Sequence, residues 1–149
     1  MIKIIKVENK DQEREFVMFP FSLYKGCDYW VPPIISEELE SMDKEKNPVF
    51  ENAEAEFYIA KKDGVTVGRI AAMVNWVEIE EQKKNKLRFG WYDTIDDLDV
   101  SKKLLESVIE FGKKRKLEFV DGPVGFSNMD KAGLLIEGYE ELNTMITWY

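Results

Sequence analysis

The chain of 149 residues contains no histidine and only one cysteine, Cys27. The absence of histidine removes the usual general base of enzymes, the Ser-His and Cys-His nucleophile pairs and every His-containing zinc site. A single cysteine excludes an intramolecular disulfide framework and is typical of a reducing compartment. Any chemistry performed by this chain must therefore use carboxylates, tyrosines, lysines or backbone amides.

Long apolar runs and a basic charge balance are missing too. The N-terminus, MIKIIKVENK, contains no apolar run long enough for a signal peptide or a membrane span, so we predict a cytoplasmic protein without a membrane partner. The formal net charge of -8 argues against nucleic acid as a partner, because binding to nucleic acid depends on clustered Lys and Arg. An acidic surface favours cations or amines instead.

The residues that are present predict one folded domain over residues 1–149, since 44% of the chain is hydrophobic and 13% aromatic. Periodicity and turn signals predict strands at 2–7, 87–94, 117–124 and 144–149, a hairpin over 56–75 joined at Asp63-Gly64, and helices from about 10, over 34–43 and over about 97–116. We expect Pro20 to interrupt the first helix. Segment 76–86 is either a short helix or a charged excursion. This order predicts an α/β (α+β) fold with a mixed sheet flanked by helices.

The helix over about 97–116 has charged ends that match its macrodipole. Asp96 or Asp97 can cap its N-terminus, Asp99 lies in its first turn, and a basic run occupies 113–116. Its predicted buried face consists of Leu104, Leu105, Val108, Ile109 and Gly112, with Phe111 at the margin. The acidic cluster could alternatively hold a hard cation, but it lacks the glycine and the distal glutamate of an EF-hand loop, so we predict no metal site.

The stretch SKKLLESVIEFGKKRKLEFV, preceded by LRFGWYD and by the hairpin KKDGVTVGRIAAMVN, resembles the core of the GNAT superfamily, the acyl-CoA N-acyltransferases. More narrowly, FPFSLYKGCDYWVPP, KNPVFENAEAEFYIA and GPVGFSNMDKAGLLIEG are similar to the N-terminal part of an uncharacterised bacterial branch of GNAT-like proteins, whose members are usually longer. The resemblance implies a GNAT-like central mixed β-sheet. It also implies acetyl-CoA or another acyl-CoA as the donor, and a small amine that attacks the thioester directly, without a covalent enzyme intermediate.

In GNAT enzymes the coenzyme lies along the strand that matches 87–94 and at the N-terminus of the next helix. The resemblance therefore places coenzyme contacts at Trp91, Tyr92, Thr94, Asp99, Ser101 and Lys102. The family loop, Gln/Arg-x-x-Gly-x-Gly/Ala, presents backbone amides to the pyrophosphate. Here the matching segment IDDLDVSKK has no glycine and has carboxylates where the phosphates would lie. The alternative function is thus a non-catalytic GNAT-fold binding or assembly module that has lost the coenzyme phosphate loop.

The resemblance further implies a carboxylate or water that deprotonates the amine and, often, a tyrosine that protonates the leaving thiolate. Asp93 at the strand end and Tyr139 in the tail are the residues offered for these catalytic roles. The alternatives are a cap or turn role for Asp93 and a packing role for Tyr139. The aromatic segment 24–33, YKGCDYWVPP, either forms a wall of the acceptor pocket or packs between two helices. The sequence leaves the oligomeric state undecided.

Overall fold

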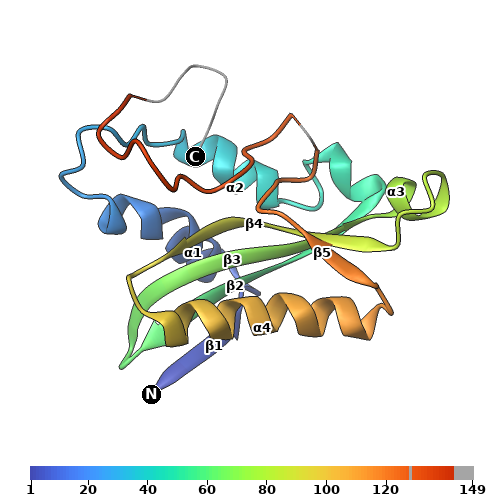
Figure 1. The fold of residues 1–149 in the computed structure, drawn as a ribbon, viewed down its shortest axis with the longest axis horizontal. Helices are drawn as coiled ribbons and strands as arrows, with labels where there is room; N and C mark the ends of the chain where they lie inside the picture. The colour runs from blue at the N-terminus through green and yellow to red at the C-terminus, as the bar shows by residue number, and fades with distance from the viewer. Residues whose placement is uncertain (128, 143–149) are drawn as a thin grey trace.

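A mixed sheet of five strands forms the centre of the structure, a computed structural model that describes residues 1–127 and 129–142 (Figure 1). The strands are β1 (Ile2–Lys6), β2 (Ala53–Lys62), β3 (Val65–Asn75), β4 (Lys86–Thr94) and β5 (Phe119–Asp121), and they lie in that order. Neighbours from β1 to β4 are antiparallel, and β5 is parallel to β4. The predicted fold class, a mixed sheet flanked by helices, is confirmed.

Helices cover both faces of this sheet. Helices α1 (Lys10–Leu23) and α2 (Ile35–Met42) lie on one face, and α4 (Leu98–Lys114) lies on the other (Figure 1). The 3-10 helix η1 (Pro48–Glu51) and helix α3 (Trp76–Glu80) are short connections. The two faces bury separate apolar clusters, one around Phe16, Phe57 and Met73 and the other around Ile70, Leu104 and Phe111.

The hairpin predicted at Asp63-Gly64 is confirmed, and the backbone angles of its turn explain why this dipeptide forms it. Asp63 has φ 52° and Gly64 has φ 87°, the left-handed conformations that a two-residue turn with the favoured twist requires. Segment 76–86 begins with the short helix α3, which settles the alternative left open by the sequence. The strand predicted at 144–149 lies outside the described residues.

The prediction that Pro20 interrupts the first helix is wrong, because α1 continues to Leu23. A proline has no N–H, so the carbonyl of Phe16, four residues earlier, loses its helical donor. Arg69 on β3 replaces it, donating from Nη1 to the Phe16 oxygen at 3.2 Å. The helix passes the proline because a buried cation from the sheet satisfies the carbonyl that the proline leaves unpaired.

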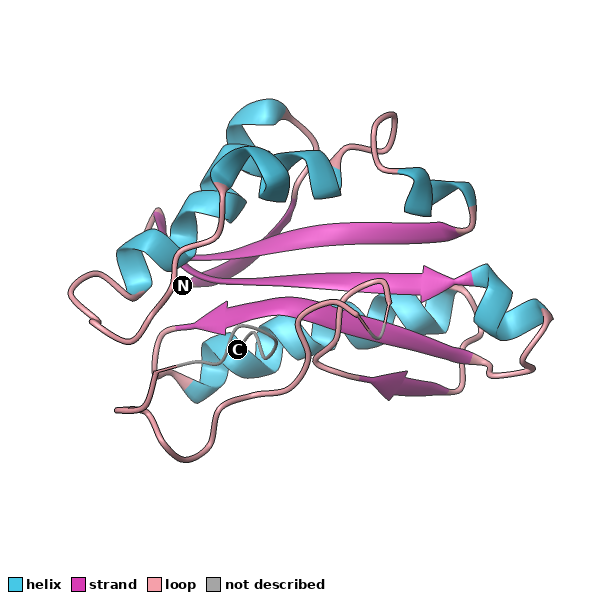
Figure 2. Cartoon of the chain, turned by 90° about the horizontal axis from the view of Figure 1, so that it is seen from above, coloured by secondary structure: helices cyan, strands magenta, loops and turns pink. Residues whose placement is uncertain are grey.

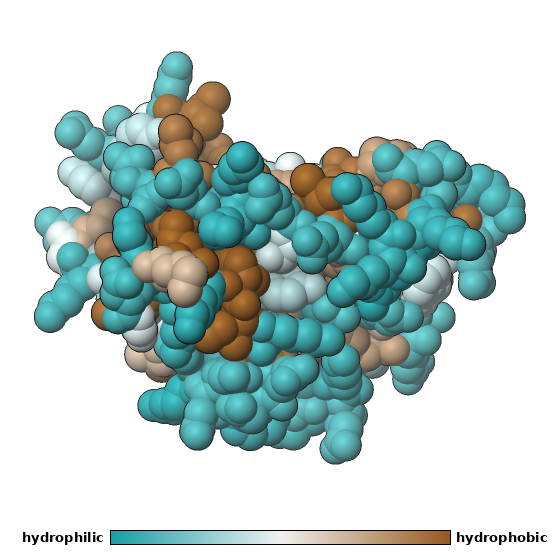
Figure 3. All heavy atoms as spheres, turned by 90° about the horizontal axis from the view of Figure 1, so that it is seen from below, coloured by the Kyte–Doolittle hydropathy of each residue, from teal (hydrophilic) through white to brown (hydrophobic). Residues whose placement is uncertain are grey.

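Helix α4 packs on the sheet through a face that differs slightly from the predicted one. The fully buried positions are Val100, Leu104, Val108, Phe111 and Gly112. Ile109 is 44% exposed, whereas Phe111 is buried rather than marginal, so these two predictions were wrong. Gly112 allows the close approach, since a Cβ there would lie 2.8 Å from the Leu87 side chain. The surface seen from the α4 side is mainly hydrophilic, with scattered apolar patches (Figure 3).

Strand β4 carries a β-bulge where it runs past β3. Two residue steps on β3, from Arg69 to Ala71, face three steps on β4, from Gly90 to Asp93. Trp91 has φ 46°, so the backbone leaves the extended conformation at this residue. The bulge places Trp91 in the cluster beneath α1 and α2, although simple alternation along the strand would have turned it toward α4.

Candidate functional site

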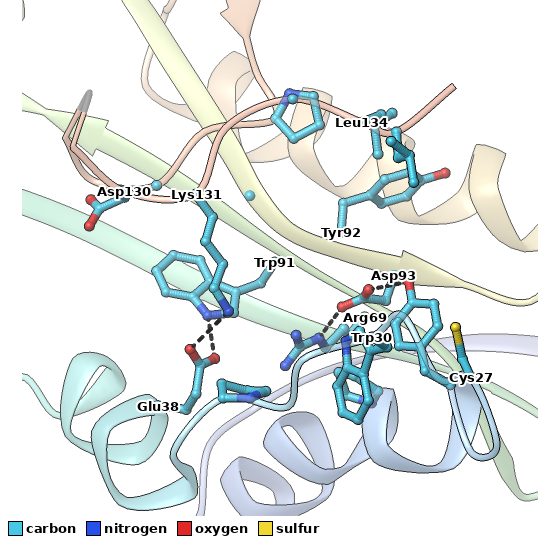
Figure 4. Close-up of a pocket in the computed structure, with 18 of the residues that line it drawn as sticks. Cys27, Trp30, Glu38, Arg69, Trp91, Tyr92, Asp93, Asp130, Lys131 and Leu134 are labelled. Atoms are coloured by element: carbon cyan, nitrogen blue, oxygen red, sulfur yellow. Dashed lines mark hydrogen bonds and ion pairs between the residues drawn. The ribbon is translucent and has the colours of Figure 1, made fainter. Parts of the chain in front are cut away.

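A cavity of about 550 Å³ lies on the α1 and α2 side of the sheet, at the bulged end of β4 (Figure 4). It is enclosed by the end of α1, the α1–α2 connection, α2, β4 and the segment after β5, and its aromatic lining consists of Tyr24, Tyr29, Trp30, Trp91, Tyr92 and Tyr139. This volume is within the range of small-molecule sites, roughly 300–1,000 Å³. The segment 24–33 therefore lines a cavity. Its rings are also packed against each other, since the Trp30 and Tyr24 ring centroids lie 5.3 Å apart in a tilted contact.

Asp93 lies in the wall of this cavity and already accepts bonds at both oxygens. The Tyr24 hydroxyl donates to Oδ1 at 2.7 Å, and Arg69 Nε donates to Oδ2 at 2.7 Å. The side chains of Arg69 and Asp93 are 5% and 15% exposed, so Arg69 is buried and Asp93 is largely shielded from water. Burial, and next the Asp93 carboxylate, raise the pKa of Tyr24. Tyr24 therefore keeps its proton at neutral pH, and its oxygen still has lone pairs for a ligand.

Glu38, on α2, supplies a second carboxylate to the cavity. Its Oε2 accepts a hydrogen bond from Trp91 Nε1 at 2.8 Å, and its Oε1 lies 3.6 Å from Lys131 Nζ. The Glu38 side chain is 12% exposed. Sequence reasoning missed Glu38, because nothing in ISEELESM distinguishes it from its acidic neighbours. It also missed Arg69, although a single charge within the apolar run of β3 is a usable signal of a buried ionic partner.

The N-terminus of α4 is capped by Asp97, which resolves the role of the acidic turn. Oδ1 of Asp97 accepts from the backbone N–H groups of Asp99 at 3.0 Å and of Val100 at 3.4 Å. Its Oδ2 accepts from Lys62 Nζ at 2.9 Å. The bond from Lys62, together with the two amide bonds, lowers the pKa of Asp97. The capping interpretation is confirmed, with Asp97 rather than Asp96 as the N-cap residue.

The site residues predicted from the sequence lie in two places, beside the first turns of α4 and in the cavity on the other face of the sheet. Tyr92 points to the α4 side, where its hydroxyl lies 2.6 Å from Ser101 Oγ, and this contact joins β4 to α4. Thr94, Asp99, Ser101 and Lys102 lie between the end of β4 and the first turns of α4, whereas Trp91, Asp93 and Tyr139 line the cavity. The structure thus brings together the two proposed catalytic side chains and one of the proposed coenzyme contacts.

The two regions that the resemblance assigns to an acyl-CoA, the edge of β4 and the N-terminus of α4, differ in how far they are already occupied. Strand β5 pairs with β4 only from Lys86 to Arg88, and elsewhere in the described ranges no strand lies beside this edge of β4 (Figure 2). The cavity lining includes Gly90 to Asp93. Val124 N–H donates to the Phe89 oxygen at 2.8 Å and the Val124 oxygen lies close to Gly90, so room beside the strand for an extended pantetheine arm begins at Trp91. The amides of Asp99 and Val100, which a diphosphate at this helix end would need, are already bonded to the Asp97 carboxylate.

The described part of the chain offers neither a metal site nor a membrane-spanning helix. Within residues 1–127 and 129–142, no group of three or more His, Cys, Asp or Glu side chains is placed to hold a metal ion. Over the same ranges, no helix combines the length and apolar character needed to cross a membrane.

Comparison with known proteins gives two relatives, while no protein-family profile matches the chain. Protein YghO of Escherichia coli is 33% identical over 132 residues, which cover 89% of this chain and 34% of that protein. The bacterial ceramide synthase of Caulobacter vibrioides is 25% identical over 141 residues, covering 93% of this chain and 36% of the synthase. The chain thus spans about a third of the length of the curated relatives it matches.

Solved structures with a similar fold include acetyltransferases. One of the GNAT family, from Staphylococcus aureus, has a TM-score of 0.56 at 19% identity, covering 83% of this chain and 74% of its own. A predicted acetyltransferase from Clostridium acetobutylicum, solved with acetyl-CoA, has a TM-score of 0.56 at 13% identity, covering 81% and 79%. An aminoglycoside acetyltransferase from a soil metagenome, in complex with sisomicin, has a TM-score of 0.55 at 14% identity, covering 80% and 75%. The predicted resemblance to the GNAT superfamily is confirmed at the level of the fold.

Proposed function

We propose that this chain, which has the fold of the GNAT acyltransferases, is an acyl-CoA-dependent N-acyltransferase-like protein that acts on a small amine. The observation that carries the proposal is the cavity at the bulged end of β4, where Asp93 and Glu38 flank space that continues to the unpaired strand edge. The relatives' names support it. A ceramide is an amide of a long-chain amine, and sisomicin, bound by a structural neighbour, carries several amino groups.

N-acyl transfer joins an amine nitrogen to an acyl carbon and releases a thiol, so the protein must hold the amine and take its proton. We assign proton acceptance to Asp93, reached through the Tyr24 hydroxyl that donates to it at 2.7 Å. Arg69 fixes this carboxylate in place. Tyr139, whose side chain lines the same cavity, is the proposed proton donor to the thiolate. An acyl-CoA bound along Trp91–Asp93 would supply the activated acyl group.

The first test is a titration of the purified protein with acetyl-CoA and with CoA, followed by calorimetry. Saturable binding at micromolar coenzyme, followed by release of thiol that depends on an added amine, supports the proposal. No binding at millimolar coenzyme contradicts it.

Substitution of Asp97 tests whether its carboxylate is the obstacle to the diphosphate. Asp97→Ser removes the charge, frees Lys62 and leaves at the helix amides only a neutral hydroxyl that a diphosphate can displace, so we expect acetyl-CoA to bind about tenfold more tightly. The matched control is Asp96→Ser. Asp96 is exposed and precedes the cap residue, and its substitution removes the same charge. Equal changes in the two variants would point to general charge, and unchanged affinity in Asp97→Ser would refute the explanation.

The second candidate function is a non-catalytic GNAT-fold module for binding or assembly. The observation that favours it is the Asp97 cap, which consumes the amides that a coenzyme phosphate would need. Amine binding to the cavity without any coenzyme binding, in both the unaltered chain and Asp97→Ser, would favour this candidate.

A further inference from the structure

The charges around the cavity are unbalanced. Among the described residues, its lining includes five acidic side chains and two basic ones; the acidic ones are Glu37, Glu38, Asp93, Asp130 and Glu141, and the basic ones are Arg69 and Lys131. Arg69 is already neutralised by Asp93 at 2.7 Å. A cavity with an excess of carboxylates and low-dielectric walls concentrates cations, so the charge favours a positively charged ligand.

The walls of the cavity are apolar and aromatic. Six aromatic residues line it, although Tyr92 directs its hydroxyl to Ser101 on α4, and Pro20, Pro33, Leu134 and Leu135 add aliphatic surface. Aromatic faces attract organic cations and also cover the apolar part of a ligand. A small hydrophilic amine would leave this surface in contact with water, so the lining favours an amine that carries an apolar body.

Glu38 is the carboxylate best placed to receive the positive group. The Trp91 indole holds its Oε2 at 2.8 Å, and burial restricts its contact with water. Oε1 is less tightly engaged, since Lys131 Nζ is 3.6 Å away. Figure 4 shows Glu38 and Lys131 on one side of the cavity and Trp30 and Cys27 on another, so a ligand at Glu38 can extend along the rings.

We propose that the cavity selects a protonated primary amine carried on an apolar body such as an alkyl chain, and that Glu38 is the residue that determines this specificity. The ammonium group binds Glu38, and the apolar body lies against the aromatic lining. The inference rests on the proposed function for the identity of the acceptor site, but it concerns binding and needs no acyl donor.

The test compares four ligands on the full chain in the absence of acyl donor: octylamine, octanol, octanoate and ethylamine. Binding is followed by calorimetry and by the fluorescence of the tryptophans, two of which line the cavity. We expect saturable binding of octylamine, at least about tenfold weaker binding of the other three, and weaker octylamine binding at high salt. Equal binding of octanol, or of ethylamine, would overturn the proposal.

Glu38→Gln then tests the assigned residue. Glutamine can still accept the Trp91 hydrogen bond but carries no charge, so octylamine should bind about tenfold more weakly while octanol is unaffected. The control is Glu106→Gln on α4, which removes an exposed charge on the opposite face of the sheet and should change nothing (Figure 1). Unchanged octylamine binding in Glu38→Gln would overturn the role of Glu38. Should this variant not fold, the four-ligand comparison on the unaltered chain still decides the substrate class.

The two proposals fail in different ways. Selective binding of octylamine without acyl transfer supports this inference and contradicts the acyltransferase function. Acyl transfer to hydrophilic amines with no preference for octylamine contradicts this inference and supports the acyltransferase function.

Discussion

Replacing Asp93 with alanine is expected to lower the free energy of unfolding by about 3–5 kcal/mol, the usual cost of removing one partner of a buried ion pair. Arg69 would remain buried without its carboxylate, and the Tyr24 hydroxyl would lose its acceptor. The effect extends to α1, because Arg69 also donates to the Phe16 carbonyl that Pro20 leaves without a helical donor. Urea unfolding followed by circular dichroism measures the change.

Asp93→Asn separates this structural role from the proposed chemical one. Asparagine keeps an acceptor for Tyr24 or Arg69, so we expect a smaller loss of stability and a full loss of the proposed proton acceptance. The matched control is Asp63→Asn, which removes a surface carboxylate paired with the N-terminal amine but keeps a residue type that tolerates the positive φ of the turn, so it should cost less than about 1 kcal/mol. A loss in Asp93→Ala no larger than in this control would show that the Arg69 pair is not important for the fold.

Replacing Glu78 with alanine is the second change with a large expected effect, also about 3–5 kcal/mol. Glu78 is buried on α3 and accepts from Arg88, whose Nε lies 3.1 Å from Oε2. Lys86 Nζ lies 3.5 Å from Oε1 and is also bonded to Asp121 at 2.6 Å. Without Glu78, Lys86 would keep its bond to Asp121, and the buried Arg88 would lose the carboxylate that accepts from its Nε. Glu80→Ala, an exposed position on the same helix, is the control and should have little effect.

The same residue predicts a loss of stability in acid. Burial alone would raise the pKa of Glu78, but the hydrogen bonds and charges of Arg88 and Lys86 outweigh it, so the pKa lies below 4.5. A carboxyl whose pKa is lower in the folded state stabilises fully above its unfolded-state pKa, and this contribution disappears as the pH falls through the folded value. The stability difference between the unaltered chain and Glu78→Gln should therefore shrink below about pH 4.5. A difference that stays constant down to pH 3 would contradict this.

Local patterns predicted the elements whose causes are local. The hairpin follows from two residues that tolerate positive φ, and α4 begins where an aspartate can cap it. The length of α1 was not predictable from Pro20, because the compensating donor, Arg69, is far away in the sequence. Alternation of side chains along β4 likewise assigns Trp91 to the wrong face of the sheet, because the bulge depends on the pairing of β4 with β3 and not on the sequence of β4 alone.

In the candidate site too, features with local causes differ from features that depend on contacts between distant segments. Asp93 and Tyr139 were offered from the sequence without a motif to identify them; both line the cavity, and their catalytic roles stay predictions. Glu38 was not, since its contact with Trp91 requires α2 and β4 to be folded against each other. The charge of the cavity likewise comes from separate segments that meet only in the folded chain.

The bulge in β4 also shows that one residue of this strand can be removed without disturbing the pairing on either side of it. Gly90 lies opposite Ala71, and Asp93 lies opposite Arg69. A strand shorter by Trp91 alone would run from Gly90 through Tyr92 to Asp93 with ordinary alternation, and Asp93 would still face Arg69. Removal of the Trp91 codon alone would therefore leave the pairing of β3 with β4 regular. This change would deprive Glu38 of its indole partner while the Arg69–Asp93 pair persists, so the proposed ligand preference would change without a change in the sheet.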